Sequence, residues 1–290
     1  MMQITRKAYA KINLGLDVLK RRPDGYHEVK MVMQTISLHD ILTFEEEAGE
    51  QITLITNERA ELPENAEDNL IYKAARLIRD TYHITEGVKI TLQKNIPIAA
   101  GMAGGSTDAA AVFHGLNELW DLHMSLQQMQ ELGVKLGADI PYCIVGGTSL
   151  SEGIGEKLTI LPPPPSCFVL IAKPDICVST KYVYENLHVN TLKKHPDVDG
   201  MVEAICQGNL QGITARMENV LETVTEKQYP IIGEIKRVML AEGAQNALMS
   251  GSGPTVFGIF TEKEKAEAAK EKVYGGALSK EVFVTEFVQP

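Results

Sequence analysis

A glycine-rich segment at residues 97–110 constrains the fold of this 290-residue chain more than any other feature. It reads Pro-Ile-Ala-Ala-Gly-Met-Ala-Gly-Gly-Ser-Thr-Asp-Ala-Ala, and the apolar residues that follow recur at the spacing of one helical face. The segment predicts a strand that leads through a tight turn into a helix. Backbone N–H groups and the positive end of the helix dipole meet at such a turn, which favours phosphate binding.

The residue types in this turn suit that chemistry. Gly101, Gly104 and Gly105 permit positive φ and a close approach of an anion to the backbone. The hydroxyls of Ser106 and Thr107 can bind phosphate or magnesium. No lysine precedes this Ser-Thr pair, so the segment is not a GxxxxGK[ST] loop. A glycine-rich turn before an ordinary capped helix remains the alternative.

The start of the helix is expected at Ser106. Ser106, Thr107 and Asp108 are all natural N-cap residues. Because a carboxylate would repel a triphosphate unless it faced away or met a cation, capping is the expected role of Asp108.

Composition and charge exclude several classes of protein. The net charge is −10 and the 28 basic residues are scattered, so nucleic acid and anionic membrane surfaces are not expected partners. No run of apolar residues is long enough to span a membrane, and the N-terminus has no apolar signal region, so we expect a cytoplasmic protein. The four cysteines have no metal-ligand spacing and are predicted to be reduced core thiols.

The chain is predicted to fold as two α+β domains. Four consecutive prolines at 162–165 form a stiff connector, which places the domains at residues 1–161 and 166–290. Extended segments and helices are expected in both domains. In the first they are a hairpin of Ile12–Val18 and Tyr26–Ile36, strands at Ile52–Thr56 and Val88–Leu92, and helices at Asn69–Tyr82, from Ser106 onward and at Leu126–Leu136. In the second they are strands at Phe168–Ala172, near Leu248, at Val256–Phe260 and at Val282–Val288, with several helices between and one at Glu262–Lys272.

Three motifs, in order, resemble those of the GHMP superfamily of small-molecule kinases. They are Ala8–Leu14, the loop from Pro97 to Ala110, and Met249–Thr255, read as Met-Ser-Gly-Ser-Gly-Pro-Thr. Together they span nearly the whole chain. The resemblance implies a ribosomal protein S5 domain 2-like N-terminal domain and a ferredoxin-like C-terminal domain, with ATP and substrate held between them.

Two further stretches resemble one branch of that superfamily, the 4-diphosphocytidyl-2-C-methyl-D-erythritol kinases. One is Arg-Pro-Asp-Gly-Tyr-His at residues 22–27, and the other is Gly-Ala-Asp-Ile-Pro at 137–141. The resemblance implies phosphorylation of the 2-hydroxyl of that cytidine-diphosphate-linked methylerythritol, with ATP and Mg²⁺, in the non-mevalonate isoprenoid pathway. The resemblance implies a small-molecule substrate and no nucleic-acid or membrane partner. The chain is expected to be a monomer or a weak homodimer.

The loop departs from the family pattern at one position. Ala103 stands where the family usually has glycine. If its φ is positive, the loop carries strain of about 1 kcal/mol.

The resemblance also assigns roles to individual residues. Asp139 is expected to accept the proton of the substrate hydroxyl, while Lys11 orients the hydroxyl and steadies charge in the transition state. From the residues alone, Asp139 could cap a turn and Lys11 could be a solvated strand lysine. Substrate binding is assigned to Asn13, Tyr26 and His27, the last two against the cytosine, and the alternative for them is a hairpin aromatic and a surface histidine.

Nucleotide binding is assigned to the loop and to two residues outside it. In the family, positions corresponding to Asn69 and Lys94 lie near the adenine, although these residues could equally be a helix cap and an exposed charge. Ser106 is the expected protein ligand of Mg²⁺, with Thr107 the other choice. The loop residues assigned to ATP are Pro97, Ile98, Ala99, Ala100, Gly101, Met102, Ala103, Gly104, Gly105, Ser106 and Thr107.

Three alternative functions would each leave a different mark on the sequence. Another GHMP kinase, acting on homoserine or mevalonate, would lack Tyr26 and His27 at this place. A catalytically silent nucleotide or sugar sensor would lack Lys11 or Asp139. A structural or RNA-associated protein, suggested by the S5-like half, conflicts with the net charge of −10.

Overall fold

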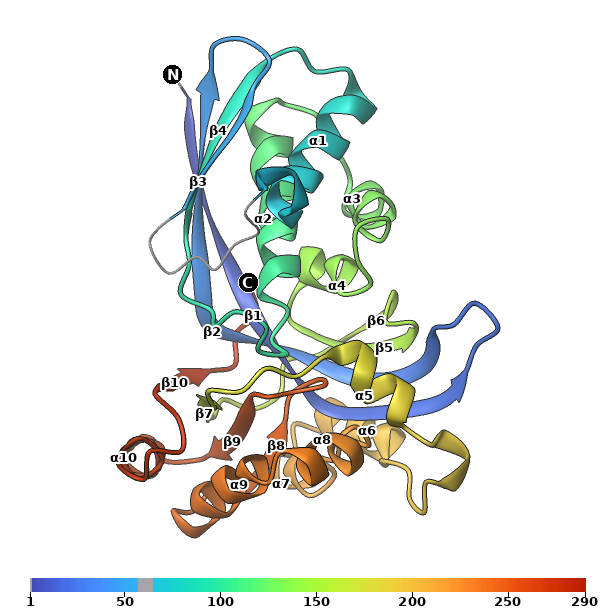
Figure 1. Cartoon of the computed structure of the whole chain (residues 1–290), viewed down its shortest axis with the longest axis vertical. Helices are drawn as coiled ribbons and strands as arrows, with labels where there is room; N and C mark the ends of the chain where they lie inside the picture. The colour runs from blue at the N-terminus through green and yellow to red at the C-terminus, as the bar shows by residue number, and fades with distance from the viewer. Residues whose placement is uncertain (1, 57–64) are drawn as a thin grey trace. The chain divides into compact units, whose positions relative to one another are not determined.

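The computed structural model describes residues 2–56 and 65–290 (Figure 1). Its Cα positions form two compact units that do not follow chain order. The first unit comprises Met1–Ala10, His39–Ile98 and Ala103–Val145, and the second comprises Lys11–Leu38, Ala99–Met102 and Gly146–Pro290. Two long strands, β1 (Gln3–Arg21) and β2 (His27–Glu47), contribute residues to both units.

The first unit has a sheet covered by helices. β3 (Ile52–Thr56) pairs in parallel with β4 (Gly87–Gln93), and β4 pairs antiparallel with the second half of β2. Its helices are α1 (Leu70–Tyr82), α2 (Gly104–Leu119), α3 (Leu126–Gly133) and α4 (Ile140–Val145), preceded by the 3₁₀ turn η1 (Ala66–Asp68).

Close packing of α2 on the sheet depends on a glycine. A Cβ atom added to Gly115 would overlap the ring of Phe44, which is fully buried in β2. Phe113 of α2 and Ile78 of α1 are also fully buried in this core. The glycine therefore brings the helix that follows the phosphate loop close to the sheet.

Strands of the second unit continue this same six-stranded sheet and also form a second sheet. β5 (Thr148–Gly153) pairs antiparallel with the first half of β2 and with β6 (Lys157–Leu161). The other sheet is entirely antiparallel in the order β10–β7–β9–β8. Its strands are β7 (Phe168–Lys173), β8 (Asn246–Met249), β9 (Val256–Phe260) and β10 (Glu281–Glu286).

Helices join the strands of the second unit. All five residues of β9 are buried, which is typical of a strand inside a sheet that is covered by helices. The helices are α5 (Thr180–Asn186), α6 (Val198–Cys206), α7 (Leu210–Thr214), α8 (Glu222–Gln228), α9 (Ile231–Ala241) and α10 (Lys263–Gly275), with the 3₁₀ turn η2 (Val189–Thr191) after α5.

The predicted α+β class and most predicted elements are confirmed. The N-terminal hairpin is present with longer strands, closed by a hydrogen bond from the Arg22 N–H to the Tyr26 carbonyl. The prolines at 162–165 connect β6 to β7, but both strands lie in the second unit. The division into domains at these prolines therefore stays a prediction.

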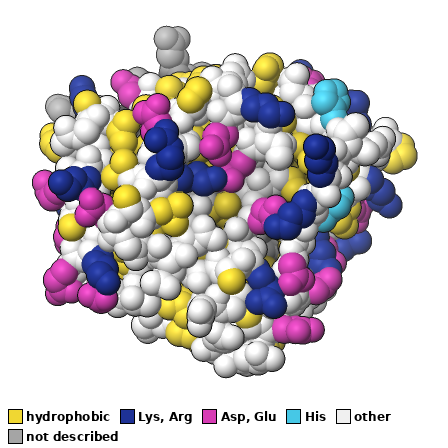
Figure 2. Space-filling view, turned by 90° about the horizontal axis from the view of Figure 1, so that it is seen from below, with side chains coloured by type: hydrophobic (Ala, Val, Ile, Leu, Met, Phe, Trp, Pro, Cys, Tyr) yellow, Lys and Arg dark blue, Asp and Glu magenta, His cyan; other side chains and the backbone are white. Residues whose placement is uncertain are grey.

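The surface charges, the helices and the cysteines can each be compared with what the composition predicts. On the face drawn in Figure 2, basic side chains stand beside acidic ones. Within residues 2–56 and 65–290, no helix has the length and apolar character needed to cross a membrane. The prediction of four core thiols is wrong, because Cys177 and Cys206 are exposed.

Candidate active site

The phosphate loop is built on alternating left-handed residues between β4 and α2. Ala99, Gly101 and Ala103 have φ values of 51°, 72° and 57°. The condition for strain at Ala103 is therefore met, since its positive φ places a Cβ atom in a conformation that costs about 1 kcal/mol. These residues turn the backbone sharply just before α2 begins.

The helix begins earlier than predicted. α2 starts at Gly104, and its N-cap is Ala103, which makes no side-chain hydrogen bond. The expectation that Ser106, Thr107 or Asp108 caps the helix is wrong, because all three lie inside α2, and the left-handed Ala103 turns the chain into it. The first N–H groups of α2 thus receive no side-chain cap, which leaves donors for an anion.

Two of the three expected caps have partners inside the first unit. The Thr107 hydroxyl donates to the Tyr9 carbonyl at 2.7 Å and is buried. Asp108 is also buried, and its Oδ2 accepts from Lys94 Nζ at 2.7 Å. Ser106, which is half-buried, is the hydroxyl of this turn with access to solvent.

Lys94 forms a buried triad with Asp40 and Asp108. Its Nζ donates to Asp40 Oδ2 at 2.5 Å as well as to Asp108, so the alternative of an exposed charge is wrong. Asp40 Oδ1 also accepts from the N–H groups of Asn95 and Ile96. A Cβ atom added to Gly104 would lie 3.1 Å from Lys94 Nζ. The ammonium group of Lys94 therefore lies next to the backbone of the phosphate loop at Gly104.

Burial and charge shift the pKa values within this triad. Burial raises the pKa of Asp108 well above its ordinary value, and Asp40 acts in the same direction while Lys94 opposes it. Burial lowers the pKa of Lys94, but the charges of Asp108 and Asp40 outweigh that effect and raise it above its ordinary value. The lysine therefore stays charged beneath the loop.

Asn69 acts as a helix cap in the first unit. Its side chain accepts a hydrogen bond from the Ile71 N–H at 2.9 Å at the start of α1. It is 7% exposed, so its side chain has little contact with solvent. The cap accounts for the asparagine by itself, and its contact with adenine stays a prediction.

Lys11 and Asn13 lie together in the second unit. Lys11 is 5% exposed, and its Nζ donates to Asn13 Oδ1 at 2.9 Å, so the alternative of a solvated strand lysine is wrong. The Lys11 N–H donates to the Met102 carbonyl at 3.2 Å. Asn13 Nδ2 in turn contacts Met31 Sδ at 3.2 Å. The strand that carries Lys11 is therefore hydrogen-bonded to the phosphate loop.

The Met249–Thr255 turn packs against the same part of the loop. Ser250 Oγ donates to the Gly101 carbonyl at 2.9 Å. A Cβ atom added to Gly101 would overlap the Ser250 carbonyl and would lie 2.9 Å from the Gly253 oxygen. Glycine is required at position 101 because two backbones meet there.

Asp139 stands where it was predicted, at the junction between α3 and α4. It is half-buried, and its carbonyl accepts the Cys143 N–H at 3.0 Å in the first turn of α4. Asp139 belongs to the first unit and Lys11 to the second, so their cooperation stays a prediction.

The predicted base-binding residues meet an unpredicted aromatic residue. Tyr26 is 59% exposed in the hairpin turn, and the His27 ring lies 5.1 Å from the Tyr184 ring at an angle of 37°. Burial and the charge of Arg21 lower the pKa of His27, which favours the neutral form of the ring. Sequence analysis missed Tyr184, because a tyrosine in a short amphipathic helix carries no signal of its contact with residue 27.

Comparison with known proteins identifies the class. The model of the GHMP kinases N terminal domain matches residues 69–147, and that of the GHMP kinases C terminal domain matches residues 201–277. A homoserine kinase structure from Cytophaga hutchinsonii shares the fold with a TM-score of 0.76 at 21% identity, covering 99% of this chain and 94% of that one. Fold and motifs together define a GHMP kinase, an ATP-dependent phosphotransferase.

Similarity over the full length narrows the class to one family. The 4-diphosphocytidyl-2-C-methyl-D-erythritol kinase of Lachnoclostridium phytofermentans is 53% identical over 99% of this chain and 98% of its own length. That of Lachnospira eligens is 49% identical over the whole of both chains. A crystal structure of 4-(cytidine 5'-diphospho)-2C-methyl-D-erythritol kinase matches with a TM-score of 0.82 at 31% identity, covering 98% of this chain and 99% of that one. The chain belongs to the family of 4-diphosphocytidyl-2-C-methyl-D-erythritol kinases.

Proposed function

We propose that the chain transfers the γ-phosphoryl group of ATP to the 2-hydroxyl of 4-diphosphocytidyl-2-C-methyl-D-erythritol, giving the 2-phosphate and ADP. The reaction belongs to the non-mevalonate route to isoprenoid precursors. Relatives at 53% and 49% identity carry the name of this kinase. The structural observation that best supports the proposal is the buried Lys11. Its side chain donates a hydrogen bond to Asn13, and its backbone N–H donates one to the phosphate loop.

The phosphates of ATP bind at the loop of residues 97–107. Three left-handed residues and an uncapped helix N-terminus offer backbone N–H groups to the phosphate oxygens. Lys94 adds positive charge directly behind Gly104, partly balanced by its carboxylate partners. Asn69 contributes at the adenine end of the same site.

The reaction forms a bond between the substrate 2-oxygen and the γ-phosphorus, and it breaks the bond from that phosphorus to the β,γ-bridging oxygen. Asp139 accepts the proton of the attacking hydroxyl. Lys11 holds that hydroxyl and offsets the negative charge that develops on the moving phosphoryl group. Asn13 fixes the lysine ammonium by accepting from it at 2.9 Å.

Magnesium fits the residues that are present. Mg²⁺ commonly takes one or two protein oxygens and fills its other positions with phosphates and water. The Ser106 hydroxyl is half-buried in the first turn of α2 and suits such a ligand, whereas that of Thr107 is tied to the Tyr9 carbonyl. No cluster of three metal-ligating side chains occurs in the described part of the chain. When bound, the ion supplies charge that neutralises the phosphates.

The cytosine binds at the rings beside the hairpin turn. Tyr26 presents an exposed face for stacking, and the neutral His27 can both donate to and accept from the polar edge of a pyrimidine. Tyr184 lies against the His27 ring and adds a second aromatic side chain beside it. We place the enzyme in the cytoplasm, as a monomer or weak homodimer.

The kind of phosphate that forms, a monoester on an alcohol, tests the proposed reaction. Product formed with ATP and the cytidyl substrate should show, by ³¹P NMR, one new phosphomonoester resonance beside the retained diphosphate pair. Lengthening of the diphosphate to a triphosphate, or no new phosphorus signal, would contradict transfer to the 2-hydroxyl.

A further inference from the structure

The turn at Met249–Thr255 touches two parts of the site within the second unit. Ser250 donates to the Gly101 carbonyl of the phosphate loop, as described above. A Cβ atom added to Gly251 would lie 3.6 Å from Asn13 Oδ1, the atom that holds Lys11. A shift of this turn would therefore move both the loop backbone and the support of the lysine.

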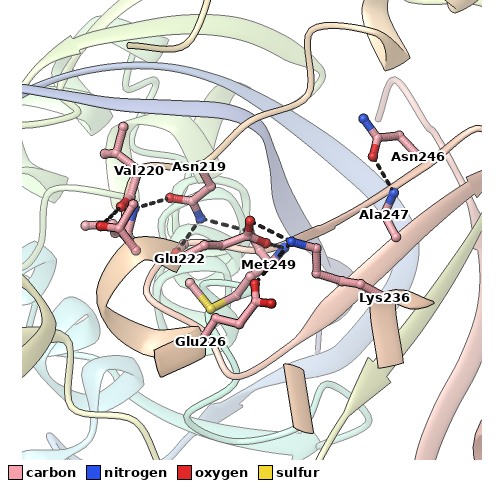
Figure 3. Close-up of polar contacts among 11 residues, drawn as sticks. Asn219, Val220, Glu222, Glu226, Lys236, Asn246, Ala247 and Met249 are labelled. Carbon is pink, nitrogen blue, oxygen red and sulfur yellow. Dashed lines mark hydrogen bonds and ion pairs between the residues drawn. The ribbon is translucent and has the colours of Figure 1, made fainter. Parts of the chain in front are cut away.

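Side chains of α8 and of the residues just before α8 form hydrogen bonds with the backbone of this turn (Figure 3). Asn219 Nδ2 donates to the carbonyls of Met249 and Gly251, each at 2.8 Å. Glu222 Oε1 accepts the Met249 N–H at 2.8 Å. Thr225 Oγ1 donates to the Ser252 carbonyl at 3.2 Å. These bonds fix four backbone groups of a turn that contains two left-handed glycines.

Glu222 links the turn to the next helix. Its Oε2 accepts from Lys236 Nζ of α9 at 2.8 Å, and the same ammonium donates to Glu226 Oε2 at 3.3 Å. The Glu222 side chain is only 15% exposed, and burial raises its pKa while Lys236 lowers it. Two donors thus approach its two oxygens from different elements.

Only a carboxylate satisfies both donors. A glutamine at 222 has one acceptor oxygen, so its NH₂ group would face either the Met249 N–H or the Lys236 ammonium. A buried donor that loses its acceptor is costly, and the turn can relieve the conflict only by moving. Glu226 accepts from the same lysine but has no hydrogen bond to the turn.

We propose that Glu222 is a positioning residue for phosphoryl transfer, acting through the Met249–Thr255 turn on Gly101 and on the Asn13–Lys11 pair. The inference rests on the proposed kinase reaction. The alternative is that Glu222 only ties α8 to α9 and contributes to stability alone.

The test compares Glu222→Gln with a matched control, Glu226→Gln. Both remove one carboxylate partner of Lys236, but only the first disturbs the turn. We expect Glu222→Gln to lower kcat for the cytidyl substrate about 10- to 100-fold, as small misplacements of reacting groups do, with KM for ATP changed less than about threefold. Glu226→Gln should keep kcat within about twofold of the wild type. Equal kcat values for the two variants would overturn the proposal.

A double variant separates positioning from the ion pair. In Glu222→Gln with Lys236→Met, the glutamine oxygen can turn to the Met249 N–H because the ammonium is gone. Recovery of kcat to within about threefold of the wild type is expected, although the ion pair stays absent. A double variant no faster than Glu222→Gln would assign the loss to the ion pair and overturn the proposal.

Two further readouts decide the question if the first variant folds poorly or the substrate is wrong. Thr225→Val is nearly isosteric and removes only the bond to the Ser252 carbonyl; a kcat about three- to tenfold lower is expected, and an unchanged kcat would count against the proposal. Amide hydrogen exchange at residues 98–105 can be measured without turnover. It should be faster in Glu222→Gln than in Glu226→Gln, and equal rates would overturn the positioning role even in a chain inactive on this acceptor.

Discussion

The ammonium of Lys94 lies 2.7 Å from Oδ2 of Asp108, and the two residues join the strand side of the phosphate loop to its helix. Both side chains are almost fully buried, together with Asp40. The loop between them is therefore fixed at both ends by one charged triad. The stability of the first unit, and the way that stability changes with pH, should both depend on this triad.

Removal of the lysine should destabilise the first unit strongly. Lys94→Met leaves Asp40 and Asp108 buried without their cation, which costs about 3 to 5 kcal/mol in the free energy of unfolding. Urea titration measures that loss. Lys89→Met, in the preceding strand β4, is the control, since Lys89 pairs with Glu45 at the surface, and it should cost far less than Lys94→Met. Similar losses for the two variants would contradict the buried triad.

Stability should depend on pH through Asp108. Its pKa is raised in the folded chain from an ordinary value of 3.8, so its contribution to stability is present below that value and is lost as pH rises toward the folded pKa. The unfolding free energy of the wild type minus that of Asp108→Asn should fall as the pH rises above about 4.

Asp197 provides a control of opposite sign. A bond from the Gly200 N–H, with Arg216 adding to it, lowers the pKa of Asp197. The corresponding difference for Asp197→Asn should stay flat from about pH 4 to pH 7 and should fall only as the solution becomes more acidic. A flat or rising difference for Asp108→Asn would contradict its raised pKa.

Glycine at position 103 should stabilise the enzyme. Ala103 has a φ of 57°, so Ala103→Gly relieves steric strain of about 1 kcal/mol, offset in part by the greater freedom of glycine in the unfolded chain. We expect a net gain of about 0.5 kcal/mol by urea titration. Ala138→Gly, in a turn with ordinary φ, should lose stability instead, and a loss at both positions would refute the strain.

Aromatic residues beside the hairpin turn should control the acceptor and not the nucleotide. Tyr26→Ala should raise KM for the cytidyl substrate about 10-fold or more, since loss of base stacking costs about 1 to 3 kcal/mol, and leave KM for ATP nearly unchanged. Tyr184→Ala should act in the same direction. Tyr182→Ala is the control, because Tyr182 is exposed on the same short helix. Equal changes in both KM values would remove these rings from the cytosine site.

Local patterns in the sequence were sufficient for most of the fold. The strand at Ile52–Thr56 has the predicted bounds and the first helix ends at Tyr82 as predicted, because alternation and helical spacing are properties of neighbouring residues. The start of α2 differs from the prediction because three cap-forming residues in succession favour a start near Ser106, whereas the glycines before them already belong to the helix. The left-handed Ala103 begins the helix instead.

Contacts between distant residues were beyond what the sequence could reveal. Lys94 and Asp40 are 54 residues apart, and no spacing rule joins them. The same holds for Glu222 and Met249, and for His27 and Tyr184. Lys11, Asn13 and the loop were found because they lie in recognisable motifs, whereas the residues that hold those motifs in place lie outside them.

The most direct test of the proposed activity is ADP release with magnesium and ATP, measured for the wild type and Asp139→Asn. Acceptors should include 4-diphosphocytidyl-2-C-methyl-D-erythritol, homoserine, mevalonate, galactose and none. We expect turnover only with the cytidyl substrate, and a kcat lower by about 10²- to 10⁴-fold in the variant with ATP binding kept. Turnover on another acceptor, or a variant as fast as the wild type, would contradict the account.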